Sequence, residues 1–400
     1  MRGAAQQSTA AFPTGQHLDN LVRYASVLPT NSDNTWSRRR VLVSLAGVAA
    51  VAPFMRGERG DLGDSRVLRY TSHLPSSHPL YHKVFLPWAE MVAERTEGRI
   101  RWEHFVDELL HGPLDGFKAV AADVTDYTHG YATYQPGSFQ LTHGLQLPFL
   151  FPNSGVAALV SEELYPTYLK GEYERMQVYL AHCTSTAAYD ILSKTPVRTP
   201  SDLRGLKVRS TGGSMAEILR QLEAIPVVLA TSETYTAFQR GIIDAVALSA
   251  PDMAAYRLYE SGSFYLPVRL THTIIQFCLN PRTFDGLPAD LRQSLHDLFR
   301  LLGQLGNINF YGGKALDSAI QTLAGGGVEV LDPTPEERQA WVDAVLPYER
   351  RFIEEHEKLG LPAAAFVREA RERSARYEGW SDQELLDHVW AHPVQGVIDV

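Results

Sequence analysis

Several features are scarce or absent in this sequence of 400 residues, and each absence excludes a class of protein. Only two cysteines occur, Cys183 and Cys278, which excludes a disulfide framework and a four-cysteine zinc site. The two thiols are either both buried and apolar, or joined in one structural disulfide. After the N-terminus no apolar run reaches about 18 residues, so we expect a soluble body. The formal net charge of −9 argues against a nucleic-acid-binding surface, which needs basic patches.

The sequence also lacks the short motifs of common enzyme classes. It has no G-x-S-x-G elbow, no Walker loop, no H-E-x-x-H pair and no dinucleotide glycine fingerprint. His78 and His82 lie four residues apart at an expected helix start, where they could bind a metal or form an ordinary exposed pair. We favour the exposed pair. The sequence therefore predicts a protein that is not an enzyme, with no metal site and no cofactor.

The first 52 residues have the features of an export signal. A basic run, SRRR at 37–40, precedes a mild apolar stretch at 41–52 that ends in small residues. The paired arginines resemble a twin-arginine signal, which predicts a periplasmic protein. A chance basic patch before a buried helix is the alternative. Residues 1–36 are long for the charged part of a signal, and Pro53 is a poor residue after a cleavage point.

Strand-like and helix-like segments alternate along the rest of the chain, after a spacer rich in glycine and charge at 53–65. Strands are predicted at 67–72, 99–105, 124–127, 177–181, 206–210, 225–229, 242–248, 273–279 and 328–331. Helices are predicted at 79–97 with an interruption at Pro87, and at 114–122, 215–223, 234–240, 288–311, 313–324 and 335–358. This alternation is typical of α/β layers with largely parallel sheets.

Residues 202–244 carry the clearest chemical signal. Arg209 ends a strand-like run and is followed at once by Ser210, a Thr-Gly-Gly-Ser stretch and a periodic helix. A strand that ends in arginine beside a helix N-terminus offers a planar, two-pronged cation and unpaired backbone N–H groups. We predict that Arg209 binds a ligand carboxylate, whereas an arginine at a strand end without this context is a solvated surface charge.

Three motifs, in order and at suitable spacing, resemble the substrate-binding subunit of TRAP transporters, the DctP-type periplasmic solute-binding proteins. They are HLPSSHPLYHKVFLPWAEMVAERTEGRI, DVTDYTHGYATYQPGSFQLTHGLQLPFLF, and PVRTPSDLRGLKVRS with its continuation to SETYTAFQRGIID. The resemblance extends from about residue 68 to about residue 360. In this family the segment around Arg209 carries the arginine that binds a carboxylate.

The resemblance implies an α/β, two-lobed periplasmic binding protein of type II-like architecture. Crossing strands and a long helix would join the lobes, with the ligand cleft between them. One lobe would comprise 66–187 and 275–313, and the other 188–274 and 314–400. The tail after Tyr377 runs beyond the family pattern, and we assign it no function.

By the same resemblance, the ligand-binding residues are Arg209, Tyr189, Tyr131, His73, Ser210, Thr231, Leu248 and Tyr134. Sialic-acid-binding members have a second arginine at the position of Tyr189, a glutamate at Tyr131, an asparagine near Leu248 and a stacking phenylalanine at Thr231. Core packing is the alternative role for the tyrosines. Two family glycines are also replaced, by Glu223, which we expect at the surface, and by Ala245.

These replacements exchange polar sugar contacts for tyrosines and an aliphatic side chain. We therefore expect a small monocarboxylate with an apolar or aromatic body as the ligand. The expected function is an extracytoplasmic receptor that closes on this ligand and delivers it to TRAP membrane subunits. A dicarboxylate receptor of the same family and a periplasmic ligand-sensing subunit remain alternatives. Glu233 and Tyr235 are expected to hold a helix start and hinge.

Overall fold

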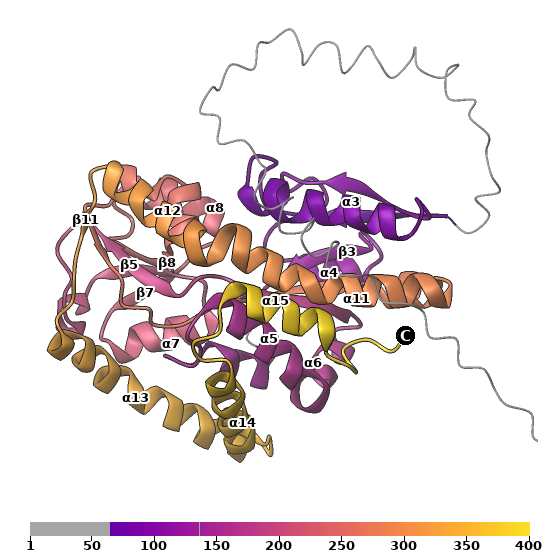
Figure 1. Cartoon of the computed structure of the whole chain (residues 1–400). Coiled ribbons are helices and arrows are strands. Elements are labelled where there is room, and N and C mark those ends of the chain that lie inside the picture. Colours follow the sequence, from indigo (N-terminus) through magenta and orange to yellow (C-terminus); the bar gives the residue numbers. More distant parts are fainter. Residues whose placement is uncertain (1–64, 136) are drawn as a thin grey trace, which may run out of the picture. The chain divides into compact units, whose positions relative to one another are not determined.

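The computed structural model describes residues 65–135 and 137–400, which contain two β-sheets and the helices around them (Figure 1). The first sheet has the strand order β2-β1-β3-β10-β4. Its strands are β1 (Arg66–Thr71), β2 (Ile100–Phe105), β3 (Tyr127–Gly130), β4 (Tyr179–Ser185) and β10 (Ile274–Leu279). Strands β1, β2 and β3 are parallel, whereas β10 is antiparallel to both of its neighbours. The sheet is therefore mixed rather than wholly parallel.

The second sheet has the strand order β11-β9-β5-β8-β6-β7. Its strands are β5 (Tyr189–Ser193), β6 (Lys207–Ser210), β7 (Ile225–Val228), β8 (Ala245–Ser249), β9 (Phe264–Leu266) and β11 (Glu329–Val330). Strand β6 is parallel to β7 and β8, and β5 is antiparallel to β8 and β9. Strands β5 and β9 were not predicted from the sequence, because their pairing partners lie far from them in the chain.

Three segments of the chain join the two sheets. Strand β4 of the first sheet leads directly to β5 of the second, and β9 of the second leads back to β10. The third is a long helical segment made of α11 (Ala289–Gly306), the π-helical turn η7 (Asn307–Tyr311) and α12 (Gly313–Gly325). It packs on β4 at one end and on α9 (Ala250–Ala255) at the other, and Figure 1 shows it in orange. This arrangement confirms the two-lobed fold with crossing strands and a long helix.

Most of the remaining helices lie between strands along the chain, and α13, α14 and α15 follow the last strand, β11. The α-helices are α3 (Leu86–Arg95), α4 (Gly116–Ala121), α5 (Ser154–Leu164), α6 (Lys170–Arg175), α7 (Gly213–Gln221), α8 (Thr231–Gln239), α10 (Pro281–Asp285), α13 (Pro335–Lys358), α14 (Ala363–Arg376) and α15 (Asp382–Ala391). Shorter turns are η1 (Leu80–Phe85), η2 (Ala132–Tyr134), η3 (Leu141–Gln146), η4 (Tyr165–Leu169), η5 (Pro200–Leu203) and η6 (Leu258–Glu260). The interruption predicted at Pro87 is confirmed: η1 ends and α3 begins there, with proline in the first turn, where it needs no hydrogen-bond donor. Within residues 65–135 and 137–400, no helix combines the length and hydropathy that a membrane span needs.

The three C-terminal helices pack on different parts of the chain. Helix α13 packs on α7, which lies between β6 and β7, whereas α15 packs on α11 and α5, and α14 packs on both α5 and α13. The contacts of α14 and α15 therefore do not favour the assignment of 363–400 to the second lobe, and the other lobe bounds stay a prediction. The tail after Tyr377 contains α15, which begins at a Ser381 cap and covers the long helix α11.

Both cysteines are free and buried, in the neighbouring strands β4 and β10. Cys183 lies opposite Gln276 and Cys278 lies opposite Leu180, so the two thiols occupy different register positions. Burial raises the pKa of both thiols well above the usual range. Of the two interpretations left open by the sequence, the structure has the buried apolar thiols.

Replacing Glu223 with glycine is expected to stabilise the fold by about 0.5–1 kcal/mol. Glu223 is exposed and has a left-handed backbone with φ of 58° at the end of α7. A side chain costs about 1–2 kcal/mol in this conformation, which exceeds the entropic cost of glycine and the surface ion pair with Arg204. Glu217→Gly is the matched control, because Glu217 lies inside α7 and also pairs with an arginine, Arg220. Urea unfolding should show opposite signs for the two variants, and two destabilised variants would contradict the strain argument.

Candidate ligand-binding site

Arg209 lies in β6, between β7 and β8, and its side chain is fully buried. Its Nε and Nη2 atoms donate hydrogen bonds to the carbonyl oxygen of Leu229, at 3.2 and 3.0 Å. Nη2 also donates to Oγ1 of Thr231, at 2.9 Å. The buried Nη1 atom has no partner among the described residues. Two protein groups thus hold the guanidinium in place, and its remaining nitrogen is available as a donor to a ligand.

The turn after Arg209 brings the two sheets close together. Gly212 and Gly213 have φ of 86° and 51°, which favour glycine. A β-carbon on Gly213 would lie 2.9 Å from Nδ1 of His143, so a side chain there would collide with η3. Ser214 Oγ donates to the carbonyl oxygen of His143 at 2.8 Å. The start of α7 therefore packs directly on the helical turns that follow β3, which closes one side of the site.

Tyrosines from three different elements lie near the guanidinium: Tyr189 in β5, Tyr134 in η2 and Tyr256 just after α9. Burial raises the pKa of Tyr134, Tyr189 and Tyr256, and the charge of Arg209 acts in the opposite direction on each. The pKa of Tyr189 is raised to about 12, so its hydroxyl remains protonated and can donate. The rings of Tyr131 and Tyr134 meet edge-on with 5.6 Å between their centroids. These rings give the site an apolar wall with a few hydroxyl groups.

A buried carboxyl group, Asp252, lies near the same cluster, because its charge acts on Tyr131, Tyr189 and Tyr256. Asp252 accepts a hydrogen bond from Ser249 Oγ, and the hydroxyl of Tyr311 lies 3.4 Å from its Oδ1. Burial raises its pKa to about 6, while its hydrogen bond with Ser249 and the charge of Arg209 favour the ionised form. The site therefore contains one cation and one titratable acid. Tyr311, Tyr256 and Asp252 were not predicted from the sequence, because they are distant in the chain and belong to no motif.

Two histidines adjoin the tyrosines on the side of the first sheet. His73 and His129 have ring centroids 4.6 Å apart, and they lie 5.6 and 5.7 Å from the ring of Tyr131. Burial lowers the pKa of His73 to about 3 and that of His129 well below its usual value. Both imidazoles are therefore neutral at physiological pH. They can exchange hydrogen bonds with a ligand but contribute no positive charge.

The expectation of an exposed pair at His78 and His82 is wrong for His78. His82 is exposed, but His78 is buried, with its Nε2 atom 4.0 Å from Oδ1 of Asp252. His82 lies in the π-helical turn η1, whereas His78 precedes that turn and packs against Phe310 of η7. Across the described part of the chain no three histidine, cysteine or acidic side chains are grouped as metal ligands.

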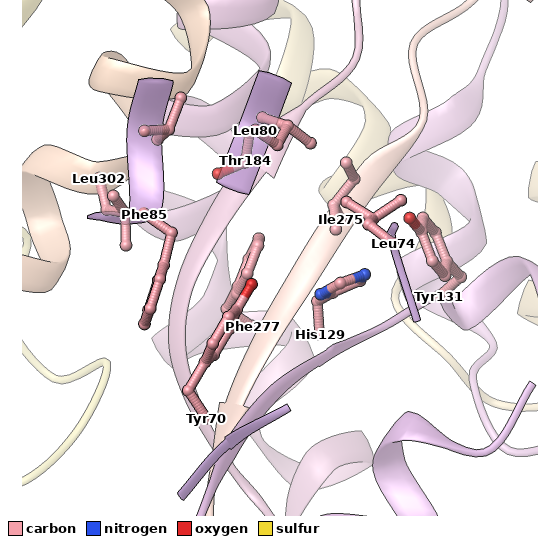
Figure 2. A pocket seen from close by; sticks show the side chains of 11 residues that line it. Tyr70, Leu74, Leu80, Phe85, His129, Tyr131, Thr184, Ile275, Phe277 and Leu302 are labelled. Atoms are coloured by element: carbon pink, nitrogen blue, oxygen red, sulfur yellow. The ribbon is translucent and has the colours of Figure 1, made fainter. Parts of the chain in front are cut away.

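A small pocket continues from Tyr131 into the first lobe, between strands β1, β3, β4 and β10 and the helical elements η1 and α11 (Figure 2). Apart from His129, Thr184 and tyrosine hydroxyls, its walls are hydrocarbon. The lining residues are Tyr70, Leu74, Leu80, Val84, Phe85, His129, Tyr131, Thr184, Ile275, Phe277 and Leu302. Since Tyr131 lines this pocket and also adjoins Tyr134 near Arg209, the pocket and the arginine site are neighbours.

The structure brings most of the predicted site residues into this region, although their contact with a ligand stays a prediction. Arg209, Tyr131, Tyr134, Tyr189, Thr231 and His73 belong to the clusters described above. Ser210 instead accepts a hydrogen bond from the backbone of Gly212, at 3.1 Å, and Leu248 is buried in β8 opposite Asp190.

The structure confirms one of the two roles that were expected near the SETY motif. Glu233 accepts a hydrogen bond from the backbone of Ala230 at the start of α8, which is the expected role at a helix start. Tyr235 donates to Glu260 of η6, which ties α8 to the neighbouring turn. Its role in a hinge stays a prediction.

Comparison with known proteins identifies the family. The family model of DctP, described as bacterial extracellular solute-binding protein, family 7, matches residues 71–356. The C4-dicarboxylate-binding periplasmic protein DctP of Rhodobacter capsulatus is 23% identical over 340 residues, which are 83% of this chain and 98% of the relative. A TRAP solute-binding protein of Rhodoferax ferrireducens, solved with copurified benzoate, has a TM-score of 0.73 and 20% identity, over 78% of this chain and 98% of that chain. A TRAP periplasmic solute-binding protein of Bordetella bronchiseptica, solved with bound mandelate, has a TM-score of 0.71 and 22% identity, over 78% and 100%. The chain belongs to the DctP family and is a TRAP solute receptor, not an enzyme.

Proposed function

We propose that this receptor binds a small monocarboxylate with an apolar or aromatic body. The carboxylate accepts hydrogen bonds from Nη1 of Arg209, and the body lies among Tyr131, Tyr134 and Tyr189. The observation that carries this proposal is the fully buried guanidinium, held by Leu229 and Thr231, with one nitrogen left unpartnered by the described residues. A buried arginine with a free donor is suited to a carboxylate, because a charge-assisted hydrogen bond offsets part of its desolvation.

The charges around the site favour one ligand carboxylate over two. Among the described residues the buried arginines are Arg209 and Arg300, and Arg300 is already paired with Glu162 at 2.8 Å. A second carboxylate would meet neutral imidazoles and the acid Asp252 instead of another cation. Burying an unpaired charge in such surroundings is strongly unfavourable.

A dicarboxylate is the second candidate, favoured by the name of the Rhodobacter capsulatus relative. The benzoate and mandelate bound by the two similar structures support the monocarboxylate. Both structures are less than 25% identical to this chain, and the charges around Arg209 are the main support for the monocarboxylate.

We assign the remaining predicted residues to roles in the same site. His73 and Leu248 would border the ligand, while Thr231 and Ser210 would act through Arg209 and the turn after it. The lobe bounds at residues 187 and 274 would mark the crossing strands.

Residues 1–52, the expected twin-arginine signal, lie outside the described residues, and export by that route is part of the proposal. In the periplasm the loaded receptor would deliver its ligand to TRAP membrane subunits, or else present it to a sensor kinase.

Calorimetric titration of the purified full chain with matched acids tests the ligand class. The pairs are butyrate with succinate and benzoate with terephthalate, and a sugar acid completes the panel. We expect each monocarboxylate to bind at least about tenfold more tightly than its dicarboxylate, equivalent to about 1.4 kcal/mol. Tighter binding of succinate would replace the proposal with the dicarboxylate receptor, and tighter binding of the sugar acid would also contradict it. If no acid bound, the role of Arg209 as the carboxylate donor would be refuted.

A further inference from the structure

His129 is a buried polar residue whose role the proposed carboxylate site leaves unexplained. Its side chain lies in β3, is 1% exposed, and neither ring nitrogen has a hydrogen-bond partner among the described residues. The Nδ1 atom of the adjacent His73 is also unpartnered. Buried polar groups in native proteins almost always have a partner, so two such imidazoles side by side require an explanation.

The pocket beside His129 could hold such a partner. Figure 2 shows the His129 ring turned toward Tyr131, with Leu74 and Ile275 alongside and Phe277 nearby. The centre of a water molecule can reach about 20 Å³ of the pocket, which is room for one water or for one small substituent. The surrounding hydrocarbon offers little competition for the ring nitrogens, so a polar atom that enters the pocket would bond to His129.

The charge state of His129 restricts what that polar atom can be. Burial keeps the ring neutral by lowering its pKa, and the nearby His73, His111, His78 and His182 lower that pKa further. A neutral imidazole has one donor and one acceptor nitrogen, which together match a hydroxyl group. It cannot neutralise a carboxylate or an ammonium group, and either ion would be buried there without a counter-charge.

We propose that His129 determines ligand specificity by hydrogen bonding to an uncharged hydroxyl or carbonyl group at the end of the ligand remote from its carboxylate. Tyr131 separates the two subsites: its ring adjoins Tyr134 near Arg209 on one side and His129 on the other. This inference rests on the proposed monocarboxylate function. It narrows the ligand class to hydroxy- or oxo-substituted monocarboxylates whose far end enters the pocket.

The test compares ligands that differ only in the remote group. Dissociation constants are measured by calorimetry for benzoate, 3-hydroxybenzoate and 4-hydroxybenzoate, and for butyrate, 4-hydroxybutyrate and 4-oxopentanoate. The protein is the full chain, as wild type and as His129→Phe, which keeps a ring against Tyr131 and Phe277 but removes both nitrogens. In the wild type we expect a substituted acid of at least one series to bind tenfold or more tightly than its parent. In His129→Phe that preference should fall to within about twofold, with the parent acid unaffected or bound more tightly.

Two further variants separate specificity from structural damage. His129→Gln keeps a donor and an acceptor, so it should restore part of the preference even if His129→Phe folds poorly. His104→Phe changes a histidine on β2 that bonds to Tyr81 outside the pocket, and it should leave the preference unchanged. The inference would be overturned if the wild type showed no preference, or if the preference survived in His129→Phe. Internal water molecules would then be the hydrogen-bond partners of the imidazoles. If no monocarboxylate bound the wild type, the proposed function would fail together with the inference, whereas loss of the preference alone would contradict only the role of His129.

Discussion

Replacing Arg209 with lysine is expected to weaken carboxylate binding by about 30-fold to several thousandfold. Truncating one partner of a buried charged pair typically costs about 2–5 kcal/mol, and each 1.4 kcal/mol is a factor of ten in affinity. Arg209 uses two of its nitrogens to bond Leu229 and Thr231, and its Nη1 has no partner among the described residues. The single ammonium group of lysine cannot reproduce this planar arrangement. It would therefore lose its hydrogen bonds either to Leu229 and Thr231 or to the ligand.

The measurement is calorimetric titration of the best monocarboxylate from the matched panel, with wild type, Arg209→Lys and Arg209→Ala. Arg204→Lys is the control, because Arg204 precedes the same strand but is exposed and pairs only with Glu223 at the surface. Thermal unfolding without ligand shows whether each variant is folded, so that a lost fold is not mistaken for a lost contact. A dissociation constant within threefold of wild type in folded Arg209→Lys would remove Arg209 from the site.

Replacing Glu162 with alanine is expected to destabilise the fold by about 3–5 kcal/mol. Glu162 lies in α5 and Arg300 in α11, and their side chains are 4% and 0% exposed. Oε2 of Glu162 accepts from Nη1 of Arg300 at 2.8 Å, and Oε1 accepts from the backbone N–H of Cys183 at 2.8 Å. Nε and Nη2 of Arg300 have no hydrogen-bond partner in the described part of the chain. Removing Glu162 would therefore leave a buried cation without a counter-charge, the costliest change that this pair allows.

Urea unfolding followed by circular dichroism measures this loss. Burial raises the pKa of Glu162 to about 7, although Arg300 and Cys183 favour ionisation, so the comparison is made at pH 8 with the carboxylate ionised. The double variant Glu162→Leu/Arg300→Met should recover most of the loss, because it removes both charges together. Glu217→Ala, which breaks an exposed pair in α7, should change the free energy of unfolding by less than about 1 kcal/mol. A loss below about 1 kcal/mol in Glu162→Ala would show that water or another side chain compensates Arg300.

Local signals were sufficient to predict several elements from the sequence. Helix α13 has the bounds that were predicted, Pro335–Lys358, and local residues fix its start: Thr334 and Glu337 form a capping box and proline occupies the first turn. Arg209 was also found from local context, at the end of a strand and before a glycine turn. Such signals depend on residues within a few positions of each other, so they can be read without the fold.

Strands β5 and β9 were not predicted, and the reason is physical. Each is a short strand that pairs with partners distant in the chain, and β5 lies between β8 and β9. Helices α14 and α15 were not predicted either, although the Ser381 cap of α15 is a local signal of a helix start. Where α15 packs, on α5 and α11, depends on side chains more than 70 residues away.

The sequence by itself determined the family, the strand–helix alternation and the candidate arginine of the site. Short motifs indicate the family and the arginine, and hydrophobic periodicity indicates the alternation. Only the tertiary structure decided the surroundings of that arginine: Asp252 and Tyr311 beside each other, and His129 buried without a hydrogen-bond partner within residues 65–135 and 137–400. Charge and hydrogen-bonding state in a cleft depend on which distant groups exclude water together, and no local pattern encodes that exclusion. The ligand class depends on the same long-range packing, because that packing decides which charged and hydrogen-bonding groups of the site are left for a ligand.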